Sequence, residues 1–205
     1  MPGPAYRILT PRLVLRCWNP ADAPLLREAV TESLEHLREW MPWARYEPES
    51  LDHVVERLRR MRAQFDSGKD FVYGIFDPSE ARVLGGTGLH TRVGPDAREI
   101  GYWIHKDQMG QGLATEAAGA LTRVALEVDG VERVEMHCDP QNTRSAAVPR
   151  KLGYTLDASL RRRARTPDGE PRDTMVWSIF RDELAASAAA GVQTEAYDVM
   201  GRRII

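Results

Sequence analysis

Two glycines, Gly110 and Gly112, stand one residue apart, just before a segment whose apolar residues recur at helical spacing, 113–128. The apolar run 100–104 that precedes them predicts a strand. A turn between a strand and a helix presents backbone N–H groups without partners, and the helix dipole favours negative charge there. Because glycine has no side chain, the backbone can approach a phosphate closely. The segment therefore predicts a site for a ligand that contains a pyrophosphate.

Three kinds of glycine loop bind such ligands, and the residues around Gly112 distinguish them. A P-loop ends in Gly-Lys-Ser/Thr, and no lysine follows Gly112, which excludes it. A dinucleotide-binding loop needs a third small residue and an acidic residue about 20 positions later. Thr115 fits the first requirement poorly, and Asp139 lies too far along for the second. The pattern Gln/Arg-x-x-Gly-x-Gly/Ala matches 109–114, with Met109 in place of Gln or Arg. This third loop resembles the coenzyme A loop of the GNAT acetyltransferases.

Four blocks of sequence, in the same order, resemble the RimJ/RimL branch of that family: 10–16, 99–104, 112–117 and 142–154. The resemblance covers about residues 8–182. It implies an α+β GNAT fold, a central mixed, twisted sheet of about seven strands flanked by about four helices in three layers. It also implies an N-acetyltransferase that moves the acetyl group of acetyl-CoA to a primary amine by direct attack in a ternary complex.

The resemblance further implies which residues bind the coenzyme. Backbone N–H groups of 110–114 would hold the pyrophosphate, with an added bond from the Thr115 hydroxyl, and the strand 102–104 would align the pantetheine arm. Met109 supplies a backbone N–H as well as Arg does, and Gln108 is a partial substitute for the missing side chain. Asn142 would contact the pantetheine arm, although Asn at this position also predicts a helix cap. The predicted coenzyme-binding residues are Tyr102, Trp103, Ile104, Met109, Gly110, Gln111, Gly112, Leu113, Ala114, Thr115, Asn142 and Ser145.

Catalysis of acyl transfer to an amine requires an acid for the leaving thiolate and a base for the amine. Ser145 lies one helical turn after Asn142, and the resemblance implies that it is the acid. Many other GNAT enzymes use a tyrosine further along this helix, near Val148, and none is present here. Glu99 is the predicted base, acting through a water. The alternatives are His90 and Glu135, and His137 shares a strand face with Glu135.

The residues expected to bind the amine are Trp40, Trp43, Tyr46 and Glu99. The three aromatic residues precede the second predicted helix, and they could equally pack the helices against the sheet. A weak base suits an N-terminal amine, with a pKa of about 8, better than a lysine at about 10.4. A protein N-terminus is therefore the preferred acyl acceptor. A free amino acid, a polyamine, an antibiotic, a larger acyl donor or a non-catalytic acyl-CoA-binding protein are the alternatives.

The elements that must position these residues follow from apolar periodicity. Helices are predicted at about 20–40, 51–65, 113–128 and 143–152, and the predicted strands are 13–16, 71–76, 83–93, 99–104, 131–138, 154–163 and 172–180. The strands on either side of the helix 113–128 should be parallel. A turn is predicted at 166–169 and a terminal helix at 185–190. The domain is expected to span 1–190. The tail 191–205 would be mobile, or would dock on a partner subunit through Tyr197, Val199, Ile204 and Ile205.

Composition bounds the class of protein. The 205 residues are enough for one domain with a core, and the net charge of −2 argues against a nucleic-acid partner. The basic cluster Arg161, Arg162, Arg163 and Arg165 predicts a solvated hairpin, and contact with RNA or an acidic substrate is the alternative. Two cysteines (Cys17, Cys138) and the absence of a signal peptide or membrane span favour a reduced, cytoplasmic setting. A homodimer is a family-level expectation. No metal is predicted, because His36, His53, His90, His105 and His137 show no ligand spacing with the cysteines.

Overall fold

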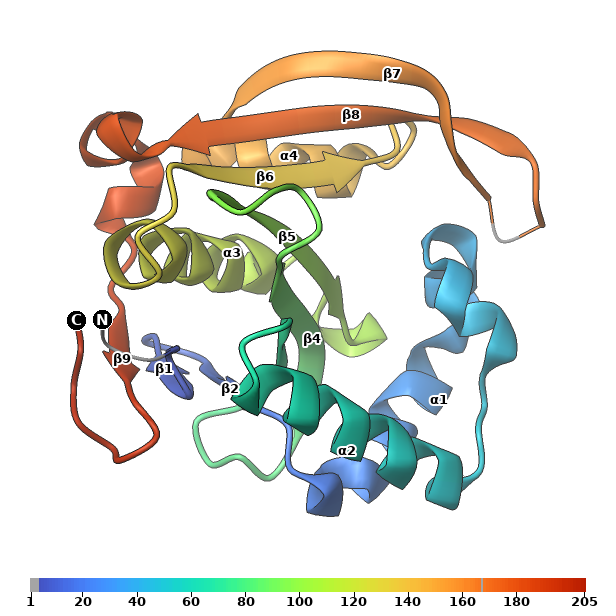
Figure 1. Cartoon of the computed structure of the whole chain (residues 1–205). Coiled ribbons are helices and arrows are strands. Elements are labelled where there is room, and N and C mark those ends of the chain that lie inside the picture. Colours follow the sequence, from blue (N-terminus) through green and yellow to red (C-terminus); the bar gives the residue numbers. More distant parts are fainter. Residues whose placement is uncertain (1–3, 167) are drawn as a thin grey trace.

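The structure, a computed structural model, describes residues 4–166 and 168–205 (Figure 1). Within these residues, nine strands form one mixed sheet in the order β7-β8-β6-β5-β4-β3-β2-β1-β9. The α+β GNAT fold is confirmed, and the sheet has more strands than predicted because β1 and β9 extend one edge. The strands are β1 (Arg7–Leu9), β2 (Val14–Cys17), β3 (Phe71–Phe76), β4 (Val83–His90), β5 (Ala97–Ile104), β6 (Arg133–Cys138), β7 (Thr155–Arg165), β8 (Pro171–Phe180) and β9 (Glu195–Tyr197).

Helices cover both faces of the sheet, which gives the predicted three layers. On one face lie α1 (Ala23–Trp40) and α2 (Leu51–Asp66), whose apolar residues join one core cluster with Trp18 and Phe76. On the other face lie α3 (Leu113–Arg123), its π-helical continuation (Val124–Val128), and α4 (Thr143–Leu152). These pack mainly on a second cluster that includes Leu89 and Ile100 (Figure 1).

The parallel pair β5 and β6 is the part of the sheet that matters most for a ligand. Ala97, Arg98 and Glu99 pair with Arg133, Val134 and Glu135. Beyond Glu99 the two strands no longer pair, although β4 still pairs with β5 as far as Ile104, and β8 with β6 as far as Cys138. The sheet therefore opens between β5 and β6 directly after Glu99. The parallel arrangement confirms the prediction from the helical crossover.

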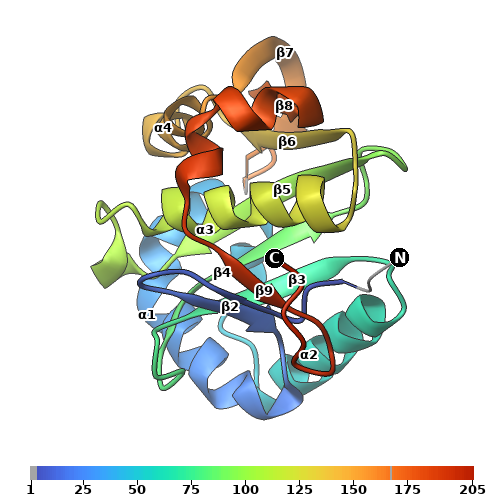
Figure 2. The same cartoon turned by 90° about the vertical axis from the view of Figure 1, so that its left-hand side faces the viewer.

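The C-terminal tail is ordered and folds back on the chain itself. β9 pairs antiparallel with β1, so the tail adds an edge strand to the same sheet (Figure 2). Arg123 Nη1 donates to the backbone oxygen of Val192 at 3.2 Å, which ties the tail to α3. The prediction of a mobile tail is wrong, because backbone pairing with β1 holds the tail in place. Of the residues predicted to dock on a partner, Tyr197 instead pairs with Arg7 of β1.

The predicted terminal helix at 185–190 is also wrong. Two 3-10 turns, Arg181–Ala186 and Ala188–Gly191, stand there because Ser187 between them is extended. The predicted turn 166–169 includes Pro167, which lies outside the described residues, as do 1–3 of the N-terminal segment. The four arginines of the basic cluster are exposed on β7. Among the described helices, none has the length and apolar character needed to cross a membrane.

Candidate active site

The glycine loop lies between the end of β5 and the first turn of α3, as predicted. Gly110 has φ +76° and Gly112 has φ +79°, a left-handed conformation that residues with side chains rarely adopt. Gly112 is the N-terminal cap of α3, and its carbonyl accepts from the N–H of Glu116. The N–H groups of the first helical turn have no acceptor within the helix. The loop therefore presents these donors at the positive end of the α3 dipole.

A network from the turn between β1 and β2 holds this loop in place. Arg12 Nη1 donates to the backbone oxygen of Gln111 at 2.9 Å, and Arg12 Nε donates to Glu116 Oε2 at 2.6 Å. The Thr10 hydroxyl donates to Glu116 Oε1 at 2.6 Å. The sequence analysis placed these residues in two separate blocks and did not predict their contact. Their role here is to fix the direction in which the first turn of α3 points.

Met109 replaces the Gln or Arg of the loop pattern, but a positively charged side chain lies next to it. Nη1 of Arg144, in the first turn of α4, lies 4.0 Å from Met109 Sδ. This brings a guanidinium to the edge of the loop, where the sequence analysis considered only Gln108. An open pocket of about 480 Å³ lies beside the loop, and its lining includes Arg12, Thr115 and Lys151. Arg144 and Lys151 therefore bring positive charge near the α3 N-terminus, where Arg12 is already paired with Glu116.

Ser145 lies on the α3 side of the sheet and contacts a tyrosine that the sequence analysis had assigned only a backbone role. Asn142 Oδ1 accepts from the N–H of Ser145 at 3.0 Å, which confirms the predicted cap of α4. The hydroxyl of Tyr102, on β5, lies 3.0 Å from Ser145 Oγ. Burial raises the pKa of the Tyr102 phenol well above its usual value, and the bond with Ser145 offsets this only in part. Tyr102 thus stays protonated at neutral pH and can supply a proton to Ser145.

Glu99 lies on the opposite side of β5, where the strands separate. Its Oε2 accepts from Arg92 Nε at 2.7 Å and lies 3.8 Å from His137 Nδ1. His137 Nε2 is 2.7 Å from Glu135 Oε2, so the structure brings three predicted candidates together. Burial raises the pKa of Glu99, but the hydrogen bonds and charge of Arg92 outweigh it and leave the pKa below its usual value. Glu99 is therefore a charged carboxylate of low basicity.

Each of the three aromatic residues expected to bind the amine contacts a different neighbour. The ring of Trp43 packs edge-on against Trp103 of β5, with centroids 6.2 Å apart. Tyr46 is 71% exposed, and the Arg45 guanidinium lies over its ring. The backbone oxygen of Trp40 accepts from Arg172, a residue of β8. Trp43 and Trp103 form a wall on the Glu99 side of the sheet.

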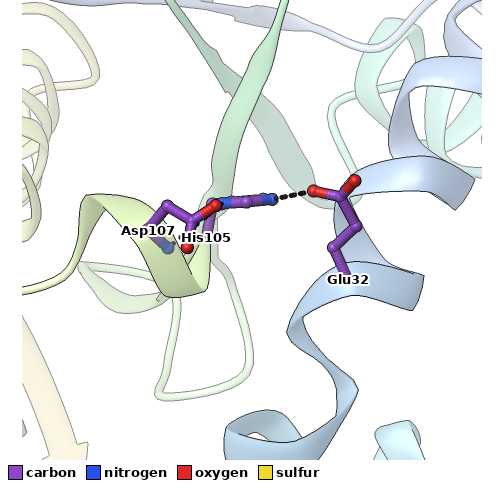
Figure 3. A group of neighbouring side chains, drawn as sticks. All are labelled: Glu32, His105 and Asp107. Carbon is purple, nitrogen blue, oxygen red and sulfur yellow. Dashed lines mark hydrogen bonds and ion pairs between the residues drawn. The ribbon is translucent and has the colours of Figure 1, made fainter.

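Glu32, His105 and Asp107 each place one potential metal-ligand atom within 4.8 Å of the other two (Figure 3). His105 Nε2 bonds to Glu32 Oε2 at 2.9 Å, and His105 Nδ1 accepts from the N–H of Asp107 at 3.3 Å. Both ring nitrogens are thus engaged without a metal. Ser33 Oγ also accepts from the N–H of Lys106. These contacts connect α1 to the segment that leads into the glycine loop.

A mixed sheet that opens between two parallel strands, beside a glycine loop at a helix N-terminus, is the arrangement of an acyl-CoA-dependent transferase. A family model described as an acetyltransferase (GNAT) domain matches residues 12–155. The chain belongs to the GNAT family and is an N-acetyltransferase. Its relatives place it in the RimJ/RimL branch.

Two relatives illustrate this placement, and two solved structures share the fold. The [ribosomal protein uS5]-alanine N-acetyltransferase of Escherichia coli (strain K12) is 29% identical over 154 residues, 74% of this chain and 79% of that protein. YdaF of Bacillus subtilis (strain 168) is 28% identical over 174 residues, 83% of this chain and 92% of its own. Mycobacterium smegmatis RimJ in complex with CoA-disulfide has a TM-score of 0.77 and 24% identity, with 92% of each chain covered. RimL, a ribosomal L7/L12 α-N-protein acetyltransferase in complex with coenzyme A, has a TM-score of 0.76 and 21% identity, covering 84% of this chain and 96% of that chain.

Proposed function

We propose that the protein transfers the acetyl group of acetyl-CoA to the α-amino group of a protein N-terminus, by direct attack in a ternary complex. The observation that carries this proposal is the opening of the sheet after Glu99. The glycine loop lies beside this opening, with Ser145 and Tyr102 on one face of β5 and Glu99 on the other. The Escherichia coli relative is named for acetylation of an alanine of ribosomal protein uS5. This supports a protein N-terminus as the acyl acceptor.

The donor is bound from the α3 side. The N–H groups of 110–114 and the Thr115 hydroxyl hold the pyrophosphate at the helix N-terminus. Arg144 supplies the charge that Met109 lacks. The edge of β5 that faces β6 has no strand partner at 102–104. The Ile104 oxygen bonds to His36 Nε2 at 3.0 Å, so the other backbone groups of this edge are the ones that can bond the pantetheine arm. Asn142, as the cap of α4, lies at the same opening.

Ser145 and Tyr102 act on the leaving group. Ser145 Oγ gives a proton to the thiolate as the carbon–sulfur bond breaks, and the Tyr102 hydroxyl at 3.0 Å restores it. The amine enters from the other face of β5, along the wall of Trp43 and Trp103. The proton of the amine passes either to Glu99 through a water, as the sequence predicts, or to His90.

The test is release of free thiol from acetyl-CoA with a panel of acyl acceptors. The panel holds peptides with Ala, Ser or Met at the N-terminus, the same peptides with a blocked N-terminus, free amino acids, polyamines and aminoglycosides. Turnover of free but not blocked peptides supports the proposal. Turnover of polyamines or aminoglycosides alone would reject a protein N-terminus. Succinyl-CoA in place of acetyl-CoA tests the acyl donor, and faster release with it would reject acetyl transfer.

A further inference from the structure

His90, the last residue of β4, is oriented by a carboxylate from the neighbouring strand end. Its Nδ1 lies 3.0 Å from both oxygens of Asp70, the residue before β3. A carboxylate only accepts, so the neutral imidazole carries its proton on Nδ1 and leaves the lone pair on Nε2. Asp70 therefore selects the tautomer in which Nε2 can take a proton.

The position of His90 Nε2 can be described by its distance from two glycines of the sheet. A Cβ placed on Gly88 would lie 2.9 Å from the His90 ring, and one placed on Gly101 would lie 3.4 Å from Nε2. The ring thus lies over the cross-strand pair Gly88 and Gly101, where the sheet has no side chains, and Nε2 is close to both positions. Gly101 stands between Glu99 and Trp103 on one face of β5, just past the point where β5 and β6 separate. Nε2 consequently faces the proposed entry path of the amine.

The charges around Glu99 make it a poorer acceptor for the proton of the amine than His90. Glu99 is bound by two nitrogens of Arg92, so its oxygens are occupied by a permanent cation. His137, from β6, is engaged with Glu135. The groups that face His90 are therefore Asp70 before β3, Glu99 on β5 and Arg92 after β4, with His137 beyond Glu99. Asp70 is hydrogen-bonded to the His90 ring itself, whereas the charge of Glu99 is paired with Arg92.

We propose that His90 is the general base of this enzyme, and that Asp70 is a positioning residue that holds it. The inference rests on the proposed function and names its base. The ammonium form of the acyl acceptor gives one proton to Nε2 of His90, which passes it to solvent. The neutral nitrogen then forms its bond to the carbonyl carbon, and the carbon–sulfur bond breaks. Sulfur takes a proton from Ser145, and Tyr102 returns one to Ser145. The second proton lost from nitrogen then replaces that of Tyr102 through solvent.

The experiment compares kcat, KM and their pH dependence for the full-length wild type, His90→Gln and Asp70→Asn, with acetyl-CoA and an N-terminal peptide. His90→Gln should lower kcat about 100-fold or more, with little change in KM, and should remove the fall in kcat at acidic pH. Asp70→Asn should lower kcat less, again with little change in KM, because the carboxylate that selects the tautomer with a free lone pair on Nε2 is lost. His53→Gln, the same change on the exposed surface of α2, should leave kcat unchanged.

Two results would overturn the inference. One is a His90→Gln enzyme whose kcat stays within about threefold of the wild type and keeps the acidic fall, since a general base contributes at least about 100-fold. The other is that Glu99→Gln alone removes the acidic fall. Thermal melting and calorimetry with coenzyme A verify the fold, and His90→Asn is measured if His90→Gln unfolds. Failure of the wild type on every peptide would instead reject the proposed acyl acceptor. His90→Gln is then assayed with whichever amine of the panel turns over, and an unchanged kcat there rejects His90.

Discussion

The Tyr102 hydroxyl lies 3.0 Å from Ser145 Oγ and 3.1 Å from the Ser145 backbone oxygen, although 43 residues separate the two in sequence. Many GNAT enzymes carry the acidic tyrosine on the helix that here is α4, as the family resemblance implies. In this chain a tyrosine comes from β5 instead and reaches the serine on α4. The hydroxyls of Tyr102 and Ser145 thus form one hydrogen-bonded pair that connects β5 to α4.

The first prediction concerns this pair. Ser145→Ala should lower kcat by about 100-fold, the lower end of general acid catalysis, with little change in coenzyme A affinity. Tyr102→Phe should lower kcat less, and adding it to Ser145→Ala should change little, because both act on the same proton. Steady-state kinetics and calorimetry measure these quantities. An unchanged kcat in Ser145→Ala would remove Ser145 from the mechanism, and fully additive effects would show that the two residues act independently.

The second prediction concerns the glycine loop. Gly112→Trp should abolish coenzyme A binding while the fold is retained, because φ +79° excludes a side chain and the ring would cover the N–H donors. Calorimetry with coenzyme A checks this. Gly201→Trp is the matched control, since Gly201 also has a left-handed φ, +73°, but lies in the tail with open space around it. Normal coenzyme binding by Gly112→Trp would show that the loop was assigned wrongly.

The third prediction concerns the charge beside Met109. Arg144→Ala should weaken coenzyme A binding by about fivefold, corresponding to about 1 kcal/mol for an exposed charge pair. The loss should shrink at high salt, because screening weakens such pairs. Arg59→Ala, which removes an exposed arginine from α2, should leave the dissociation constant unchanged. Equal affinities for Arg144→Ala and the wild type at low salt would contradict a role for Arg144.

The fourth prediction concerns pH and stability. The pKa of Glu99 is lowered in the folded protein, so its pairing contributes stability above the unfolded pKa, about 4.3, which is lost as pH falls through the folded pKa. Arg92→Met removes the partner and should lower the free energy of unfolding at neutral pH by about 1–3 kcal/mol. The difference from the wild type should disappear under strongly acidic conditions, as urea titrations across pH would measure. A deficit that stays constant with pH would mean that Arg92 stabilises by packing alone.

The fifth prediction concerns the tail. Val192 lies against α3, where a Cβ on Gly119 would come within 2.6 Å of Val192 Cγ2. Val192→Ala should therefore lower the free energy of unfolding by about 1 kcal/mol, because the two methyl groups that are lost are partly buried. Val199→Ala, the same change at a residue that is 63% exposed, should have no measurable effect. Equal unfolding midpoints for the two variants would show that the tail does not contribute to stability.

The sequence by itself determined the local elements and the class of site. Apolar periodicity located β3 and α4 at the residues where the structure has them, and the glycine spacing located the loop before α3. These predictions succeed because they depend on the backbone and on neighbours a few residues away. The family resemblance added the coenzyme, the mixed sheet between two layers of helices, and Ser145.

Only the tertiary structure decided which side chains meet. The bond from Thr10 to Glu116 spans 106 residues, and that from His90 to Asp70 spans 20. The tail also needed the structure, because an edge strand of three residues carries little periodicity and is recognised only by its pairing with β1. Strand register and the crossing of helices over the sheet set these contacts, and neither is encoded in local spacing. The sequence therefore predicted the glycine loop before α3, while the register of β4 against β5 set His90 opposite Glu99.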